Sequence, residues 1–119
     1  MSLIRVYIVL ATILFPLFPL INHRGEFMTE KYIEKHLRNE VKKLGGRAFK
    51  FSSPGNNGVP DRIVLYQGRC FFVELKRPGE SLRPLQKVMV KLFKKLGFKV
   101  YVIDSIEKVR VFIDEICTT

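Results

Sequence analysis

The stretch GVPDRIVLYQGRCFFVELK, residues 58–76, determines how the rest of the sequence is interpreted. It contains two β-branched and aromatic runs, DRIVLY and CFFVEL, joined by the short segment QGR. Such runs on either side of a glycine-containing turn are typical of a β-hairpin. Asp61 begins the first run, and Glu74 and Lys76 end the second, so antiparallel pairing would bring all three together.

Two carboxylates and a lysine at one end of a hairpin favour chemistry on phosphate esters. Asp61 and Glu74 would raise each other's pKa, and a hard divalent cation such as Mg²⁺ would relieve that repulsion. Lys76 follows Glu74 by two residues and therefore shares its face of the strand. Its ammonium could hold a water or stabilise a developing charge, as hydrolysis of a phosphodiester requires. Each feature alone is more often structural, either as a turn residue or as a solvated ion pair.

The flanking sequence predicts one domain with the element order α-β-β-β-α-β-α. Apolar residues at helical spacing predict a helix from Thr29, its N-cap, to the LGG segment at 44–46. Residues 85–96 form a strongly amphipathic pattern with lysines on the opposite face, and Ser105 caps a last helix. Four runs have strand character: RAFKFSS, DRIVLY, CFFVEL and FKVYVI.

This order predicts an α/β fold with a mixed four-stranded sheet flanked by helices. Three strands follow one another as a meander, and the amphipathic helix provides a crossover to the fourth. Helices can then cover both faces of the sheet.

Composition and charge narrow the class of protein. A chain of 119 residues is enough for one ordinary domain, and a formal net charge of +10 favours a polyanionic partner such as nucleic acid. Cys70 and Cys117 have no zinc or disulfide spacing, which favours a reduced, cytoplasmic protein. Because Cys70 lies in a strand-like run, we expect a buried free thiol there.

Residues 1–27 differ in character from the rest. The run from Val6 to Ile21 is uncharged, but it falls short of the roughly 20 residues of a spanning helix and contains Pro16 and Pro19. It could be a membrane anchor, an export signal, or an extension translated from a misplaced start. We favour the last, because residues 28–119 form a self-sufficient domain with 19 basic and 10 acidic residues.

The motifs in residues 28–119 resemble those of a known nuclease superfamily. GVPD followed by VELK is similar to the PD-(D/E)XK signature, and the predicted element order is similar to its restriction-endonuclease-like core. The longer stretch KFSSPGNNGVPDRIVLYQGRCFFVELKRPGESLRPLQ, with the LGFKVYVI ending, resembles the VRR-NUC family of virus-type replication–repair nucleases. The resemblance extends from about Thr29 to Ile106.

The resemblance implies a role for each motif residue. Asp61 and Glu74 would bind Mg²⁺, for which Mn²⁺ could substitute, together with the backbone carbonyl of Leu75. Lys76 would be the catalytic lysine. Gln86, at the start of the amphipathic helix, would contact the active site.

The family also implies a glutamate on the first helix. Glu30 fits this position best, and Glu34 is the alternative.

The resemblance implies DNA, branched DNA in particular, as the substrate, and a homodimer as the assembly; no small-molecule cofactor is expected. Phosphate contacts give affinity without sequence information. The basic residues expected to make them are Lys50, Arg62, Arg77, Arg83 and Lys87.

The sequence therefore predicts a Mg²⁺-dependent, structure-selective DNA endonuclease that acts in phage-type replication or repair, in the cytoplasm of the host cell. Three alternatives stay open. A restriction-type endonuclease would cut at a fixed sequence, and a non-catalytic DNA-binding module would keep the fold without cutting. A membrane-tethered protein would require residues 1–27 to be functional.

Overall fold

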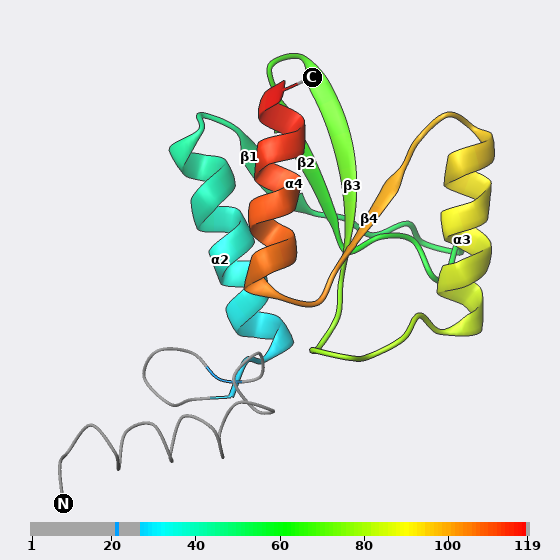
Figure 1. The fold of residues 1–119 in the computed structure, drawn as a ribbon. Coiled ribbons are helices and arrows are strands. Elements are labelled where there is room, and N and C mark those ends of the chain that lie inside the picture. Colours follow the sequence, from blue (N-terminus) through cyan, green and yellow to red (C-terminus); the bar gives the residue numbers. More distant parts are fainter. Residues whose placement is uncertain (1–20, 22–26, 119) are drawn as a thin grey trace, which may run out of the picture.

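The computed structural model describes Ile21 and residues 27–118, and within them the predicted element order is confirmed (Figure 1). The elements are α2 (Glu30–Lys43), β1 (Arg47–Lys50), β2 (Arg62–Tyr66), β3 (Arg69–Leu75), α3 (Pro84–Lys95), β4 (Val100–Ile103) and α4 (Ile106–Thr118). Apart from Ile21 and Phe27, the N-terminal extension lies outside the described residues, and so does its predicted origin. None of the described helices is long and apolar enough to cross a membrane.

The sheet is mixed, as predicted, with the strand order β1-β2-β3-β4. The first three strands pair antiparallel, and β4 runs parallel to β3. In the hairpin, Arg62 pairs with Val73, so Asp61 lies opposite the end of β3 where Glu74 is found. The pairing register therefore brings the two carboxylates of the opening motif to one end of the sheet.

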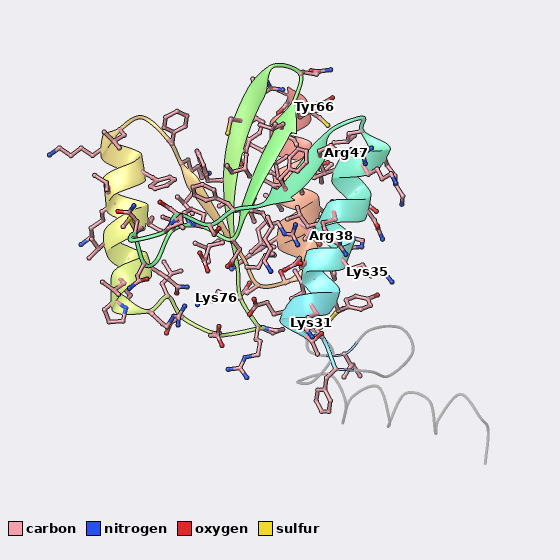
Figure 2. All side chains as sticks on the ribbon, turned by 180° about the vertical axis from the view of Figure 1, so that it is seen from behind. Lys31, Lys35, Arg38, Arg47, Tyr66 and Lys76 are labelled. Carbon is pink, nitrogen blue, oxygen red and sulfur yellow. The ribbon has the colours of Figure 1, made fainter. Side chains whose placement is uncertain are left out.

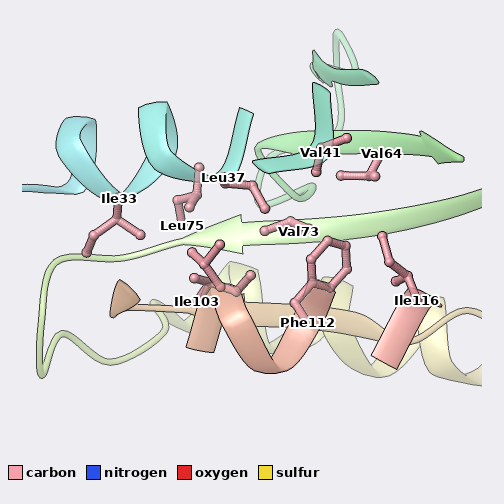
Figure 3. Packing of buried hydrophobic residues seen from close by; sticks show 10 residues of the cluster. Ile33, Leu37, Val41, Val64, Val73, Leu75, Ile103, Phe112 and Ile116 are labelled. Atoms are coloured by element: carbon pink, nitrogen blue, oxygen red, sulfur yellow. The ribbon is translucent and has the colours of Figure 1, made fainter. Parts of the chain in front are cut away.

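The main core lies between the sheet and two helices, α2 and α4, which pack side by side on one face (Figure 1). Ile33, Leu37 and Val41 project from α2 at helical spacing and are fully buried. The other members of this cluster come from α4 and from β2, β3 and β4 (Figure 3): Val64, Val73, Leu75, Ile103, Val109, Phe112 and Ile116. This core holds α2 against the hairpin and so determines where the first-helix acids lie.

Both predicted N-caps are present. The Thr29 hydroxyl accepts a hydrogen bond of 3.1 Å from the Tyr32 backbone N–H, and Ser105 Oγ accepts one of 3.1 Å from the Lys108 N–H. Such bonds satisfy backbone donors that the first turn of a helix leaves without a partner.

The third helix packs on the other face of the sheet through aromatic side chains. Phe93 of α3 and Phe98 contact Phe72 of β3 edge-on, with ring centroids 4.8 and 5.5 Å apart. The amphipathic pattern predicted the helix correctly, but much of its apolar face is exposed to solvent. Between 42% and 66% of the surface is accessible for Leu85, Val88, Leu92 and Leu96.

The prediction of a buried thiol at Cys70 is wrong, because this residue is exposed. Cys70 pairs with Leu65 close to the turn of the hairpin, and Leu65 is exposed as well. The turn end of the hairpin thus carries exposed apolar residues, which none of the described helices covers.

Candidate active site

The predicted motif residues surround one cavity of about 420 Å³ at the end of the hairpin. Four acids line it, and they come from α2, from the residue before β2, from β3 and from the loop after β3: Glu30, Asp61, Glu74 and Glu80. Lys76, Arg83 and Gln86 also line the cavity, together with Leu75. The tertiary structure therefore brings together polar side chains that are up to 56 positions apart in the sequence, from Glu30 to Gln86.

Asp61 is held in place by the backbone of both neighbouring strands. Its Oδ2 accepts a hydrogen bond of 2.8 Å from the Leu75 N–H, and its carbonyl accepts one of 2.8 Å from the Phe51 N–H. The preceding loop presses against α3 at Gly58, where φ is +89°. A Cβ at this position would lie 2.6 Å from the Leu85 carbonyl oxygen, so glycine is required for the approach.

Glu74 is buried, with 2% of its surface accessible. Gln86 Nε2 donates a hydrogen bond of 3.0 Å to Glu74 Oε1, while the Gln86 Oε1 accepts one of 2.9 Å from the Arg83 N–H. Burial raises the pKa of Glu74 to about 8, aided by a side-chain hydrogen bond with Asp61 and by the charge of that carboxylate. Without a cation, this carboxylate pair therefore tends to keep a proton.

The donor set of the cavity suits a hard divalent cation. Among the described residues, no group of three or more histidine, cysteine, aspartate or glutamate side chains could hold a metal ion. A site here would therefore combine the carboxylates of Asp61 and Glu74 with the Leu75 carbonyl. Mg²⁺ is commonly bound by one or two carboxylates and retains several waters, so the oxygen donors that are present fit it.

Lys76 is almost fully buried beside this pair, and its ammonium forms a salt bridge with Glu80 Oε1 at 3.4 Å. Figure 2 shows Lys76 between α2 and α3. Glu80 was not predicted from the sequence as a residue of the site. The available signal was the RPGE turn at 77–80, which returns an acid toward the residues at the end of β3.

The structure distinguishes the two candidate acids of the first helix. Glu30 lines the cavity, and burial together with the negative charge of Asp61 raises the pKa of its carboxyl group. Glu34, one turn later, instead forms an ion pair with Arg62. Glu30 is therefore the acid that reaches the cavity.

The prediction that Arg62 contacts DNA is wrong, because its side chain is buried between α2 and the sheet. Its guanidinium pairs with Glu34 and donates a hydrogen bond of 3.3 Å to the Ala48 carbonyl. Its Nε has no hydrogen-bond partner among the residues that the structure describes. Arg62 therefore joins the helix that carries Glu30 to the strand that follows Asp61.

The other basic residues predicted to contact DNA remain accessible: Lys50, Arg77, Arg83 and Lys87. Arg83 lines the cavity itself, and Lys87 lies on the first turn of α3. A row of exposed basic residues that the sequence analysis did not single out follows α2 at helical spacing, with Lys31, Lys35 and Arg38 labelled in Figure 2. Exposed positive charge is thus present at the cavity, through Arg83, and along α2, the helix that also carries Glu30.

Comparison with known proteins agrees with this geometry. No protein-family profile matches the sequence. "Putative nuclease p44" of Acyrthosiphon pisum secondary endosymbiont phage 1 is 54% identical over 78 residues, which are 64% of this chain and 83% of that protein. A solved structure described as "VRR_NUC domain" is 32% identical with a TM-score of 0.67, over 71% of this chain and 94% of the other. The chain therefore belongs to the VRR-NUC family.

Proposed function

We propose that this protein is a Mg²⁺-dependent DNA endonuclease that selects branched DNA. The observation that carries the proposal is the buried Glu74, whose carboxylate is paired with Asp61 and lies in one cavity with Lys76. Membership of the VRR-NUC family and the phage relative named as a nuclease support the same reaction class. The reaction is hydrolysis, in which water adds to phosphorus, one P–O ester bond breaks and the leaving oxygen gains a proton.

The residues of the cavity divide this work. Asp61, Glu74 and the Leu75 carbonyl would hold Mg²⁺, or Mn²⁺ in its place. When bound, the cation supplies a Lewis acid and lowers the pKa of water. Lys76 orients the attacking water or stabilises the charge that develops on phosphate. Gln86 keeps Glu74 oriented, and Glu30 adds a carboxylate at the side of α2.

The basic surface around the cavity supports DNA as the substrate. Residues 28–119 carry 19 basic and 10 acidic side chains, and the accessible Arg83 lines the cavity. Phosphate contacts from Lys50, Arg77, Arg83 and Lys87 give affinity that falls with salt and does not depend on sequence. The protein then recognises the shape of the DNA and not its base sequence. It acts in replication or repair, in the cytoplasm of a phage-infected cell.

The exposed apolar face of α3 supports a homodimer. Leu85, Val88, Leu92 and Leu96 recur at the spacing of one helical face, and each is accessible to solvent. A second copy of the chain would cover this face by helix–helix packing. Two active sites in one assembly would allow paired cuts across a DNA junction.

Cleavage assays on the full chain and on Lys76→Ala test the function. Four-way junction, flap and linear duplex DNA would each be incubated with Mg²⁺, Mn²⁺ or EDTA. We expect the native protein to cut branched DNA when a metal is present and Lys76→Ala to cut none. Equal cutting of all three substrates would remove the selectivity for branched DNA, and a fixed cut sequence would indicate a restriction-type enzyme. Tight, salt-sensitive binding without cutting under any metal would replace the enzyme with a DNA-binding module.

A further inference from the structure

The loop after β3 folds back over the cavity through a tight turn at residues 77–80. The Glu80 N–H donates a hydrogen bond of 3.0 Å to the Arg77 carbonyl, and Gly79 has φ of +77°. Pro78 and Gly79 are the central residues, as a type II turn requires. The Gly79 N–H also donates to Asp104 Oδ2 at 3.3 Å, which ties the turn to the segment before α4. The position of the Glu80 carboxylate therefore depends on a supported backbone.

The two oxygens of Glu80 contact two different cations. Oε1 lies 3.4 Å from Lys76 Nζ. Oε2 lies 2.7 Å from Arg77 Nη2 and accepts a hydrogen bond of 2.8 Å from Arg77 Nε. The Lys76 side chain is 5% exposed and that of Arg77 is 71% exposed. One carboxylate thus connects a buried ammonium in the cavity to a guanidinium at the surface.

The carboxylate of Glu80 competes with the carboxylate pair for the same ammonium. Lys76 has a flexible stem of four carbons, and it lines the same cavity as Asp61 and Glu74. If the ammonium moved onto Asp61 and Glu74, it would neutralise the negative charge that a divalent cation needs for binding. A salt bridge to Glu80 keeps Lys76 at the side of the cavity and leaves the carboxylate pair for the metal.

We propose that Glu80 is a positioning residue that holds the Lys76 ammonium at the side of the cavity, and that Arg77 holds Glu80. The inference rests on the proposed function, in which Lys76 acts on the attacking water or the developing charge. Arg77 lowers the pKa of Glu80, so the carboxylate is charged in the neutral range. Because Arg77 is exposed, a DNA phosphate can reach the guanidinium that already contacts Glu80. The binding of a DNA phosphate to Arg77 and the position of the Lys76 ammonium are then linked through the Glu80 side chain.

Glu80→Gln in the full chain tests this role, with Glu80→Asp as the conservative variant. Glu107→Gln is the matched control, because Glu107 forms the same i,i+3 ion pair with Arg110 on the exposed surface of α4. Cleavage is measured over a range of DNA concentrations to separate kcat from KM. The Lys76 ammonium is followed by ¹H–¹⁵N NMR in metal-free protein, where its signal is identified by its loss in Lys76→Ala.

We expect Glu80→Gln to lower kcat about tenfold, with a smaller change in KM, and to shift the Lys76 ammonium signal. Glu80→Asp keeps the charge and should retain more activity, and Glu107→Gln should match the native protein. Unchanged kcat and an unchanged Lys76 signal in Glu80→Gln would overturn the inference while leaving the nuclease intact. A higher kcat would also overturn it, because Glu80 would then inhibit Lys76. If the native protein cuts no DNA but Glu80→Gln moves the Lys76 signal, the proposed function fails and the positioning contact stands.

Discussion

Gln86 Nε2 donates a hydrogen bond of 3.0 Å to Glu74 Oε1, and both side chains are buried. The Arg83 N–H fixes which end of the Gln86 amide faces Glu74, since it donates to the Gln86 oxygen. The start of α3 therefore orients a carboxylate on β3. This helix also packs on the sheet through Phe93, so one element joins the sheet and supports a residue of the candidate active site.

Gln86→Ala should weaken both the fold and the site. The substitution leaves a buried carboxylate oxygen without its donor, which costs about 1–3 kcal/mol of unfolding free energy. Cleavage should fall by roughly 10- to 100-fold, because supporting hydrogen bonds hold metal ligands in position. Urea unfolding and single-turnover cleavage measure the two effects. Lys91→Ala, at an exposed position of the same helix, is the control, and equal behaviour of the two variants would refute the role of Gln86.

Glu74→Gln should stabilise the metal-free protein at alkaline pH. The folded-state pKa of Glu74 is about 8, above its ordinary value of 4.5. The stability that this group contributes is therefore complete below about pH 4.5 and is lost as the pH rises toward 8. Glutamine resembles the protonated acid and has no such loss, so we expect a gain of roughly 1–3 kcal/mol at pH 8.

Urea unfolding in EDTA at pH 5 and pH 8 measures this difference. The native protein should lose stability between the two values more steeply than Glu74→Gln does. Glu107→Gln is the control, because the pKa of Glu107 is lowered by Arg110 and its variant should gain no stability at high pH. Parallel pH profiles for the native protein and Glu74→Gln would contradict the raised pKa.

Alanine substitution of Arg62 should lower the stability of the fold, whereas alanine substitution of Arg77 should instead change DNA binding. Arg62→Ala leaves Glu34 without its partner at the interface of α2 and the sheet, and should cost roughly 1–3 kcal/mol of stability. Arg77→Ala should leave stability nearly unchanged and reduce the salt dependence of DNA binding by about one phosphate contact. Thermal unfolding and DNA titrations at several salt concentrations separate the two. Loss of DNA affinity without loss of stability in Arg62→Ala would restore Arg62 to the DNA surface.

Gly58→Ala should damage the loop that carries Asp61. The new Cβ would meet the Leu85 carbonyl at 2.6 Å, and φ of +89° is already unfavourable for alanine. Gly55→Ala is a matched control, because φ is +81° and no atom lies within 4 Å of its Cβ. Gly55→Ala should lose about 1 kcal/mol of unfolding free energy, because alanine is strained at a positive φ. Gly58→Ala should lose roughly 1–3 kcal/mol more, and with it most of the cleavage activity. Equal unfolding midpoints for the two variants would show that the loop does not need its contact with α3.

Leu92→Lys should disrupt the proposed homodimer. Leu92 lies in the middle of the exposed apolar face of α3, where a charge would be buried between two copies of the chain. Val111→Lys places the same charge at an exposed apolar position of α4 and serves as the control. Analytical ultracentrifugation should find monomers for Leu92→Lys and dimers for the native protein and Val111→Lys. Identical sedimentation of all three proteins would remove α3 as the dimer contact.

Some features were predictable from the sequence because their causes are local. The β-branched and aromatic runs DRIVLY and CFFVEL, the turn between them and the caps at Thr29 and Ser105 depend on neighbours a few positions away. Antiparallel pairing of two adjacent strands then places Asp61 opposite Glu74 without further information. The fold class, the hairpin and the meeting of these two carboxylates were therefore determined by the sequence itself.

Other features depend on which surfaces become covered, and the tertiary structure decided them. Glu30 and Glu34 lie one turn apart on the same helix, and the packing of α2 on the sheet directs one into the cavity and the other to Arg62. Cys70 and the apolar face of α3 have the composition of core residues, but no element of the described chain covers them fully. Glu80 reaches Lys76 because a turn reverses the chain. Periodicity specifies the faces of an element, whereas burial and charge pairing depend on what packs against each face.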